Sequence, residues 1–208
     1  MRITNGLVLL LAACGLLCAC TSLARAPQPR EVLDERSGTT LIIVERPTVL
    51  ARPRSDVAAN ARDYLTLVGL QEDRSGRFTT WLIVHRWSTV DPRIAADHGV
   101  GSGRLRIIAD DREILLSPAA PAPPLLERGD LLFGPHTARE HSAAYPIDVP
   151  ILHFLATAQS LSANFPDDAL PIAYGIWQDG RSALMALVAA AEAPGRPAGQ
   201  LSGPPPAR

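Results

Sequence analysis

The sequence contains no lysine and carries almost no net charge, and this composition argues against binding to DNA or RNA. All 20 basic residues are arginine, and 21 acidic residues give a net charge of −1 at pH 7. This balance produces no extended positive field that would attract DNA or RNA. The glycine-rich segment 100–104 precedes a predicted strand, whereas phosphate-binding loops follow a strand and open a helix. We therefore expect no nucleic-acid partner and no nucleotide.

Cysteine is almost absent as well. The three cysteines, Cys14, Cys18 and Cys20, all lie within the first 20 residues. A domain that begins after them has no thiol for a disulfide, for a thiolate metal site or for a cysteine nucleophile. Its stability must therefore come from a hydrophobic core, and nothing in the remaining sequence indicates a cofactor.

The first 20 residues have the pattern of a secretory signal peptide. Arg2 is followed by an apolar run from Gly6 to Leu17 and then by small residues. This run is too short for a permanent membrane-spanning helix, which needs ~20 apolar residues. Leu17-Cys18-Ala19-Cys20 resembles the bacterial lipoprotein box, whose last cysteine is acylated and becomes the first mature residue. Leu11-Ala12-Ala13-Cys14 is an alternative box, although it leaves an apolar run of about 7 residues, the lower end of the usual range.

This resemblance to a lipoprotein box predicts where the protein resides. Acylation at Cys20 divides the chain into a signal peptide at 1–19 and an acylated tether at 20–30, with Cys14 as the alternative lipidation site. Thr21 stands where lipoproteins of the inner membrane carry an aspartate. The resemblance therefore implies the periplasmic face of the outer membrane, with the membrane as one partner and a second envelope protein as another. The competing interpretation is an ordinary secreted protein whose cysteines are simply apolar signal-peptide residues.

Residues 31–193 predict a single α+β domain, an antiparallel sandwich-like sheet or partial barrel with two packed helices. The clearest signal is a hairpin of strands 64–70 and 78–87 across a turn-rich spacer. Apolar residues on both faces of these strands indicate inner strands that are covered on two sides. Further strands are predicted at 39–45, 48–51, 104–109, 113–116, 161–165 and 170–177, and helices are predicted to begin at Asp148 and at Gly180.

Three segments outside these elements carry weaker signals. Residues 56–63 are rich in alanine and predict one helical turn. Residues 117–130 contain four prolines and predict a long surface connection, because proline cannot donate to a sheet ladder. Residues 194–208 have no apolar periodicity and predict a disordered tail rich in proline and glycine.

Two short motifs lie within the predicted domain. They are Ala58-Ala-Asn-Ala-Arg-Asp-Tyr-Leu-Thr-Leu67 and Arg86-Trp-Ser-Thr-Val-Asp91. With them the region from Val32 to Ala193 resembles a group of uncharacterised bacterial lipoproteins. The resemblance implies lipoprotein identity, and its motifs are tied to no activity, so it assigns no catalytic residue.

The most metal-like residues are His136, Glu140 and His141. The two histidines are five residues apart, which does not place two ligands on one helix face as a four-residue spacing does. We therefore interpret this segment as a solvated polar loop, with a metal site as the weaker alternative.

His85 is the candidate catalytic residue. It lies on a predicted strand, and a histidine in such a place is usually structural, with its imidazole at the edge of the core and hydrogen-bonded to a neighbour. A pairing with Asp63 or Asp91 would instead give the acid–base pair of a periplasmic hydrolase. Asp63 can instead have a structural role, because Asp63 and Arg62 at the start of the strand could form a cap or an ion pair with Arg86.

The three tryptophans, Trp81, Trp87 and Trp177, could line a groove for a sugar or a hydrophobic ligand, although large aromatics on strands more often belong to the core. Taken together, these patterns favour a lipid-anchored binding or scaffolding module of the cell envelope without catalytic activity. A hydrolase that uses His85 is the alternative.

Overall fold

The computed structural model describes residues 27–89, 103–128, 132, 142–168 and 171–193. The strands are β1 (Pro29–Asp34), β2 (Thr39–Val44), β3 (Thr48–Pro53), β4 (Arg62–Arg74), β5 (Arg77–Ser88), β6 (Leu105–Ala109), β7 (Arg112–Leu116), β8 (Ser142–Pro146), β9 (Leu161–Asn164) and β10 (Tyr174–Gln178). The helices are α4 (Val149–Thr157) and α5 (Arg181–Ala191), with a 3-10 helix η2 (Pro124–Arg128).

The ten strands form one antiparallel sheet, which confirms the predicted α+β class. Its main path runs β1-β2-β4-β3-β10-β9-β6-β7, and β5 pairs with β4 and with β8. One edge of β4 therefore pairs with β2 and β3 in succession, while the other edge pairs with β5. The backbone N–H of Ala119, just after β7, donates to the carbonyl of Ala144 in β8. This contact connects the end of β7 to β8, so the strands β8, β5, β4, β3, β10, β9, β6 and β7 curl into a partial barrel, and β1 and β2 extend beyond it.

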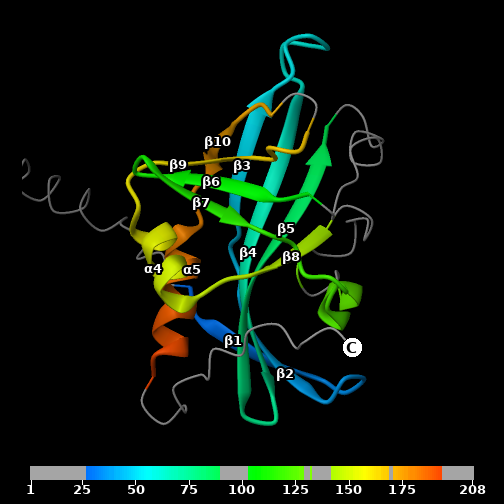
Figure 1. The fold of residues 1–208 in the computed structure, drawn as a ribbon, viewed down its shortest axis with the longest axis vertical. Coiled ribbons are helices and arrows are strands. Elements are labelled where there is room, and N and C mark those ends of the chain that lie inside the picture. Colours follow the sequence, from blue (N-terminus) through cyan, green and yellow to red (C-terminus); the bar gives the residue numbers. More distant parts are fainter. Residues whose placement is uncertain (1–26, 90–102, 129–131, 133–141, 169–170, 194–208) are drawn as a thin grey trace, which may run out of the picture.

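The β4–β5 hairpin is the longest strand pair of the fold and runs along the longest axis of the molecule (Figure 1). Its turn requires left-handed residues, and Ser75 and Gly76 adopt φ values of 55° and 82°. The Asp73 carboxylate accepts a hydrogen bond from the Gly76 N–H and closes the turn. β4 is buried along most of its length and β5 through its second half up to Arg86, as the apolar residues on both faces predicted.

Each face of the hairpin contributes to a different hydrophobic core. The inner face carries Leu65, Leu67 and Leu82 into the larger core, which α4 and α5 cover on one side of the sheet. Gly69 makes this packing possible, because a Cβ there would lie 2.9 Å from the Cδ2 atoms of both Leu184 and Leu187 on α5. The outer face forms the smaller core, in which Val68, Leu70 and Ile83 pack with Leu41, Ile43, Leu125, Leu132 and Ala144.

Several elements differ from the prediction. The segment 56–63 lies in turns: the Val57 and Ala58 N–H groups both bond to the Arg54 carbonyl, three and four residues back, which closes one helical turn at 54–58, slightly before the predicted position. β4 already begins at Arg62. The segment 117–130 contains η2, whose Leu125 is buried. β1 and β8 were not predicted. β1 is a mostly exposed edge strand, so it lacks apolar alternation, and β8 is built around alanines with low strand propensity.

Candidate functional site

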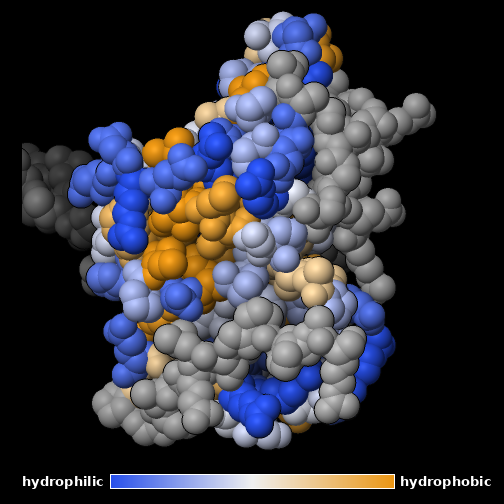
Figure 2. Space-filling model, viewed as in Figure 1, coloured by the Kyte–Doolittle hydropathy of each residue, from blue (hydrophilic) through white to orange (hydrophobic). Residues whose placement is uncertain are grey.

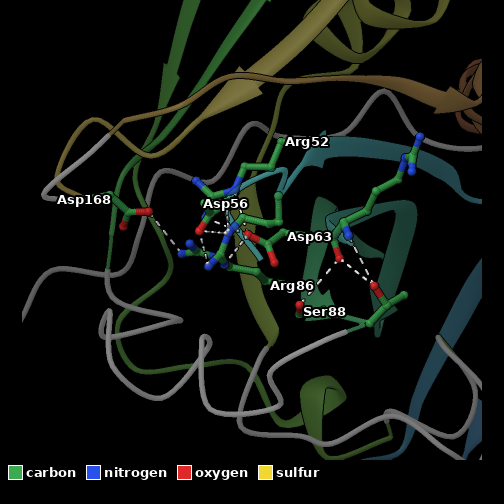
Figure 3. Close-up of polar contacts among 9 residues, drawn as sticks. Arg52, Asp56, Asp63, Arg86, Ser88 and Asp168 are labelled. Carbon is green, nitrogen blue, oxygen red and sulfur yellow. Dashed lines mark hydrogen bonds and ion pairs between the residues drawn. The ribbon is translucent and has the colours of Figure 1, made fainter. Parts of the chain in front are cut away.

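A cluster of buried charges lies on the inner face of the sheet, where β3 and β4 pair. Asp63 is fully buried and lies opposite Arg52 in the register of β3 with β4. The Asp63 Oδ2 atom accepts from Arg52 Nη2 at 2.7 Å and from Arg52 Nε at 2.8 Å. Arg54 Nη1 lies 3.4 Å from the same oxygen and also bonds to the exposed Asp56, whose pKa it lowers (Figure 3).

The predicted pairing of Asp63 and Arg62 with Arg86 is wrong. Arg86 Nη1 instead lies 3.1 Å from Asp168 Oδ2, and both side chains are largely buried (Figure 3). The register explains the difference, because Arg86 is opposite Leu65 and the Asp63 carboxylate is already held by Arg52 from the strand on the other side. The guanidinium of Arg62 is on the outer face, 4.5 Å from the centre of the Trp177 ring.

Two arginines, Arg52 and Arg86, thus balance two aspartates, Asp63 and Asp168. Tyr174 lies among these charges, with the Arg52 guanidinium 4.9 Å from its ring centre. Burial raises the pKa of the Tyr174 hydroxyl, and the positive charges of Arg86 and Arg52 partly oppose this rise. Each carboxylate of the cluster is thus held by at least one guanidinium inside the fold.

His85 lies on the outer face of β5 and is closed to solvent, with 1% of its surface exposed. Its Nδ1 atom is 3.0 Å from the Ser142 hydroxyl of β8, which matches the predicted core-edge imidazole. His85 is opposite Thr66, and Asp63 is three residues before Thr66 on β4. Successive side chains alternate between the faces of a strand, so Asp63 points away from His85 and the proposed pair with Asp63 does not form.

The outer face also carries a group of three aromatic side chains and one arginine, which we call the aromatic surface: Arg62, Tyr64, Trp87 and Trp177. Trp177 is exposed, Arg62 and Trp87 are half-buried, and Tyr64 is buried. The Tyr64 and Trp87 rings stack with centroids 4.1 Å apart and an interplanar angle of 11°. Trp177 meets Tyr64 edge-on at 6.3 Å, and 56% of its surface is exposed. The indole N–H of Trp87 donates to the Thr66 hydroxyl at 3.0 Å, which fixes the stacked pair on the sheet.

The structure therefore brings together two of the three tryptophans that the sequence singled out. Trp81 lies apart, opposite Leu70 near the other end of β5, and donates to Glu72 Oε2 at 3.2 Å. Sequence reasoning missed Tyr64 and Arg62. The hairpin register could have indicated Tyr64, since it lies directly opposite Trp87.

A comparison with protein-family models found no match, and comparisons with characterised proteins and with solved structures found no significant similarity. The resemblance to uncharacterised lipoproteins therefore stays a prediction.

The remaining candidate residues lie outside the described part of the chain: Cys14, Cys20, Asp91, His136, Glu140 and His141. Within the described residues, no three histidine, cysteine or acidic side chains gather closely enough to hold a metal ion. No helix in the described segments is long and apolar enough to cross a membrane.

A further apolar area lies over β6 and β7, where Leu115 is exposed (Figure 2).

Proposed function

We propose that this chain is a lipid-anchored lipoprotein at the periplasmic face of the outer membrane. In this proposal Cys20 carries the acyl chains, residues 20–30 form the tether, of which the last two already belong to β1, and the domain acts as a non-enzymatic binding or scaffolding module. The anchor rests on the lipoprotein-box resemblance of Leu17-Cys18-Ala19-Cys20. Two or more acyl chains, at ~0.8 kcal/mol per buried methylene, give stable attachment to a bilayer.

The aromatic surface is the observation that carries the binding role. Tryptophan and tyrosine are enriched where proteins make contacts, because they offer a large apolar area with a polar group at one end. Trp177 is the largest of the exposed apolar side chains in the described residues, and Arg62 adds a positive charge directly over its ring. By contrast, the ionisable side chains of the inner face are held in buried ion pairs.

The anchor is tested by metabolic labelling with palmitate. We expect the wild type and Cys14→Ser to be labelled and Cys20→Ser to be unlabelled, because a serine hydroxyl cannot form the thioether to diacylglycerol. Cys20→Ser should also leave the membrane fraction. Label that persists in Cys20→Ser and disappears in Cys14→Ser would transfer the anchor to Cys14.

The binding role is tested by affinity capture from solubilised envelopes, with the full acylated chain as bait. We expect Trp177→Ala to reduce capture of the envelope component that the wild type retains. Trp81→Phe is the matched control, because Trp81 lies outside the aromatic surface. Equal capture by wild type and Trp177→Ala would remove the aromatic surface from the proposal.

A further inference from the structure

Exposed apolar side chains are concentrated around one strand. Six large hydrophobic residues are exposed in the described part of the chain, and three of them, Ile172, Ile176 and Trp177, lie in β10 or just before it. The pairing of β10 with β3 has an irregularity between Ile176 and Gln178, the kind of bulge that redirects side chains. The strand is central in the sheet, yet all residues after Tyr174 are exposed. An inner strand with such a surface needs a physical explanation.

The strand pairing limits the distance between this surface and the point where the predicted tether enters the domain. β10 flanks β3 and β1 flanks β2, while β3 and β2 share one edge of β4. β10 ends with Gln178 opposite Val49, and β1 begins with Pro29 opposite Val44. Val44 and Val49 are five residues apart, so at most about 17 Å of chain separates them, and each strand spacing adds about 5 Å. The chain before Pro29 therefore leaves the domain within about 27 Å of Gln178, the residue after Trp177.

The length of the predicted tether limits how far this surface can be from the membrane. Cys20 precedes Pro29 by nine residues. At ~3.3–3.6 Å per residue, a fully extended chain of this length spans about 30 Å. An acylated Cys20 thus holds Pro29 within about 30 Å of the bilayer, and the aromatic surface can reach the headgroups if the domain lies down on the membrane.

The chemistry of the aromatic surface fits a phospholipid headgroup layer. Tryptophan prefers the membrane–water interface, where the ring meets acyl chains and the polar atom meets water, and Trp177 is the exposed ring of this surface. The Arg62 guanidinium stacks on Trp177, and among the described residues it forms no ion pair with a carboxylate. It is therefore free to bind a lipid phosphate, for which arginine has the matching donor geometry.

We propose that the aromatic surface, with the neighbouring Ile176, docks on the phospholipid headgroup layer of the membrane in which Cys20 is anchored. Trp177 enters the interface and Arg62 binds phosphate groups. The inference rests on the proposed lipid anchor and assigns the membrane as the partner of the same surface. Anchor and surface together make two attachment points, which fix the orientation of the domain and keep the opposite side free.

The test is fluorescence quenching in proteoliposomes. The full acylated chain is reconstituted into vesicles of phosphatidylethanolamine and phosphatidylglycerol, with and without lipids brominated near the headgroup. We expect the brominated lipids to quench part of the tryptophan emission. Trp177→Phe should remove most of that quenched part, since Trp87 is only half-buried and keeps the rest, and Trp81→Phe should retain it. Equal quenching in wild type and Trp177→Phe would overturn the proposal.

A second measurement separates the surface from the anchor. The full chain with Cys20→Ser should adsorb weakly to vesicles that contain phosphatidylglycerol, and the further change Trp177→Ala should lower its partition coefficient about tenfold, which corresponds to ~1.4 kcal/mol. If palmitate labelling shows acylation but Trp177 is neither quenched nor needed for adsorption, the docking proposal fails and the anchor stands. If labelling is absent while adsorption depends on Trp177, the anchor fails and the surface stands.

Soluble peptidoglycan fragments provide the remaining outcome. A change in Trp177 fluorescence with these fragments and none with vesicles would show a glycan site and overturn membrane docking.

Discussion

Replacing Asp63 by asparagine is expected to lower the free energy of unfolding by about 3–5 kcal/mol, the usual effect of breaking a buried ion pair from one side. Asp63 is fully buried and accepts two short bonds from Arg52. Asparagine keeps the size of the side chain but removes its charge. Two buried arginines would then face only Asp168, and the desolvated charge of Arg52 would lose its partner. This loss is a large fraction of the ~5–15 kcal/mol that stabilises an ordinary domain.

The assay is urea denaturation of the full chain, followed by tryptophan fluorescence. Glu45→Gln is the control, because the Arg30–Glu45 pair is 3.6 Å long and its side chains are 51% and 74% exposed. Exposed pairs contribute little, so this variant should unfold almost as the wild type does. The double variant Arg52→Met with Asp63→Leu should recover much of the loss, since apolar residues of similar size often replace buried pairs without penalty. If Asp63→Asn and Glu45→Gln have equal effects, the reasoning from burial is wrong.

Four further predictions concern Leu82 in the core, the His85 imidazole, the close packing at Gly69 and the stability in acid. Leu82→Ala should lower the unfolding free energy by ~2–5 kcal/mol in the same urea assay, because Leu82 is fully buried in the larger core, and a loss below about 1 kcal/mol would contradict that placement. His85→Gln should lower it by only ~1 kcal/mol, about one net hydrogen bond, and abolition of a hydrolytic activity present in the wild type would refute the scaffold role. Gly69→Ala should be destabilising by ~1–3 kcal/mol through overpacking against α5, and a neutral result would show that Leu184 and Leu187 can move aside. In acid, the Arg104 side chain lowers the pKa of Asp167 from 3.8 to about 2, and N–H groups of Ser160 and Gln159 lower that of Asp110. Since these pKa values are lower in the folded state, the stabilisation by the two ionised carboxylates is complete above about pH 4 and is lost as pH falls toward 2. Thermal unfolding scans across that range should therefore show a falling midpoint temperature, and the fall should be smaller in Asp110→Asn.

Local patterns in the sequence were enough to determine much of the fold. The hairpin of β4 and β5, the start of α4 at Asp148 and Pro150 and the strand at β10 all follow from turn residues and apolar periodicity, and the structure contains them. The burial of His85 also follows, because its neighbours on both sides belong to an inner strand. These features depend on residues that are close in sequence, where each side chain meets a neighbour at a fixed spacing.

Strand order, in contrast, was decided only by the tertiary structure. Asp63 pairs with Arg52 because β3 lies along β4, and Arg86 meets Asp168 because the chain after β9 returns to the same place. Trp177 reaches Tyr64 because β10 flanks β3, although 113 positions separate the two residues in sequence. Periodicity reports which face of a strand is buried, but it carries no information about which strand lies next to it. That choice depends on how the whole sheet closes around its core, and it is this closure that assembles both the buried charges and the aromatic surface.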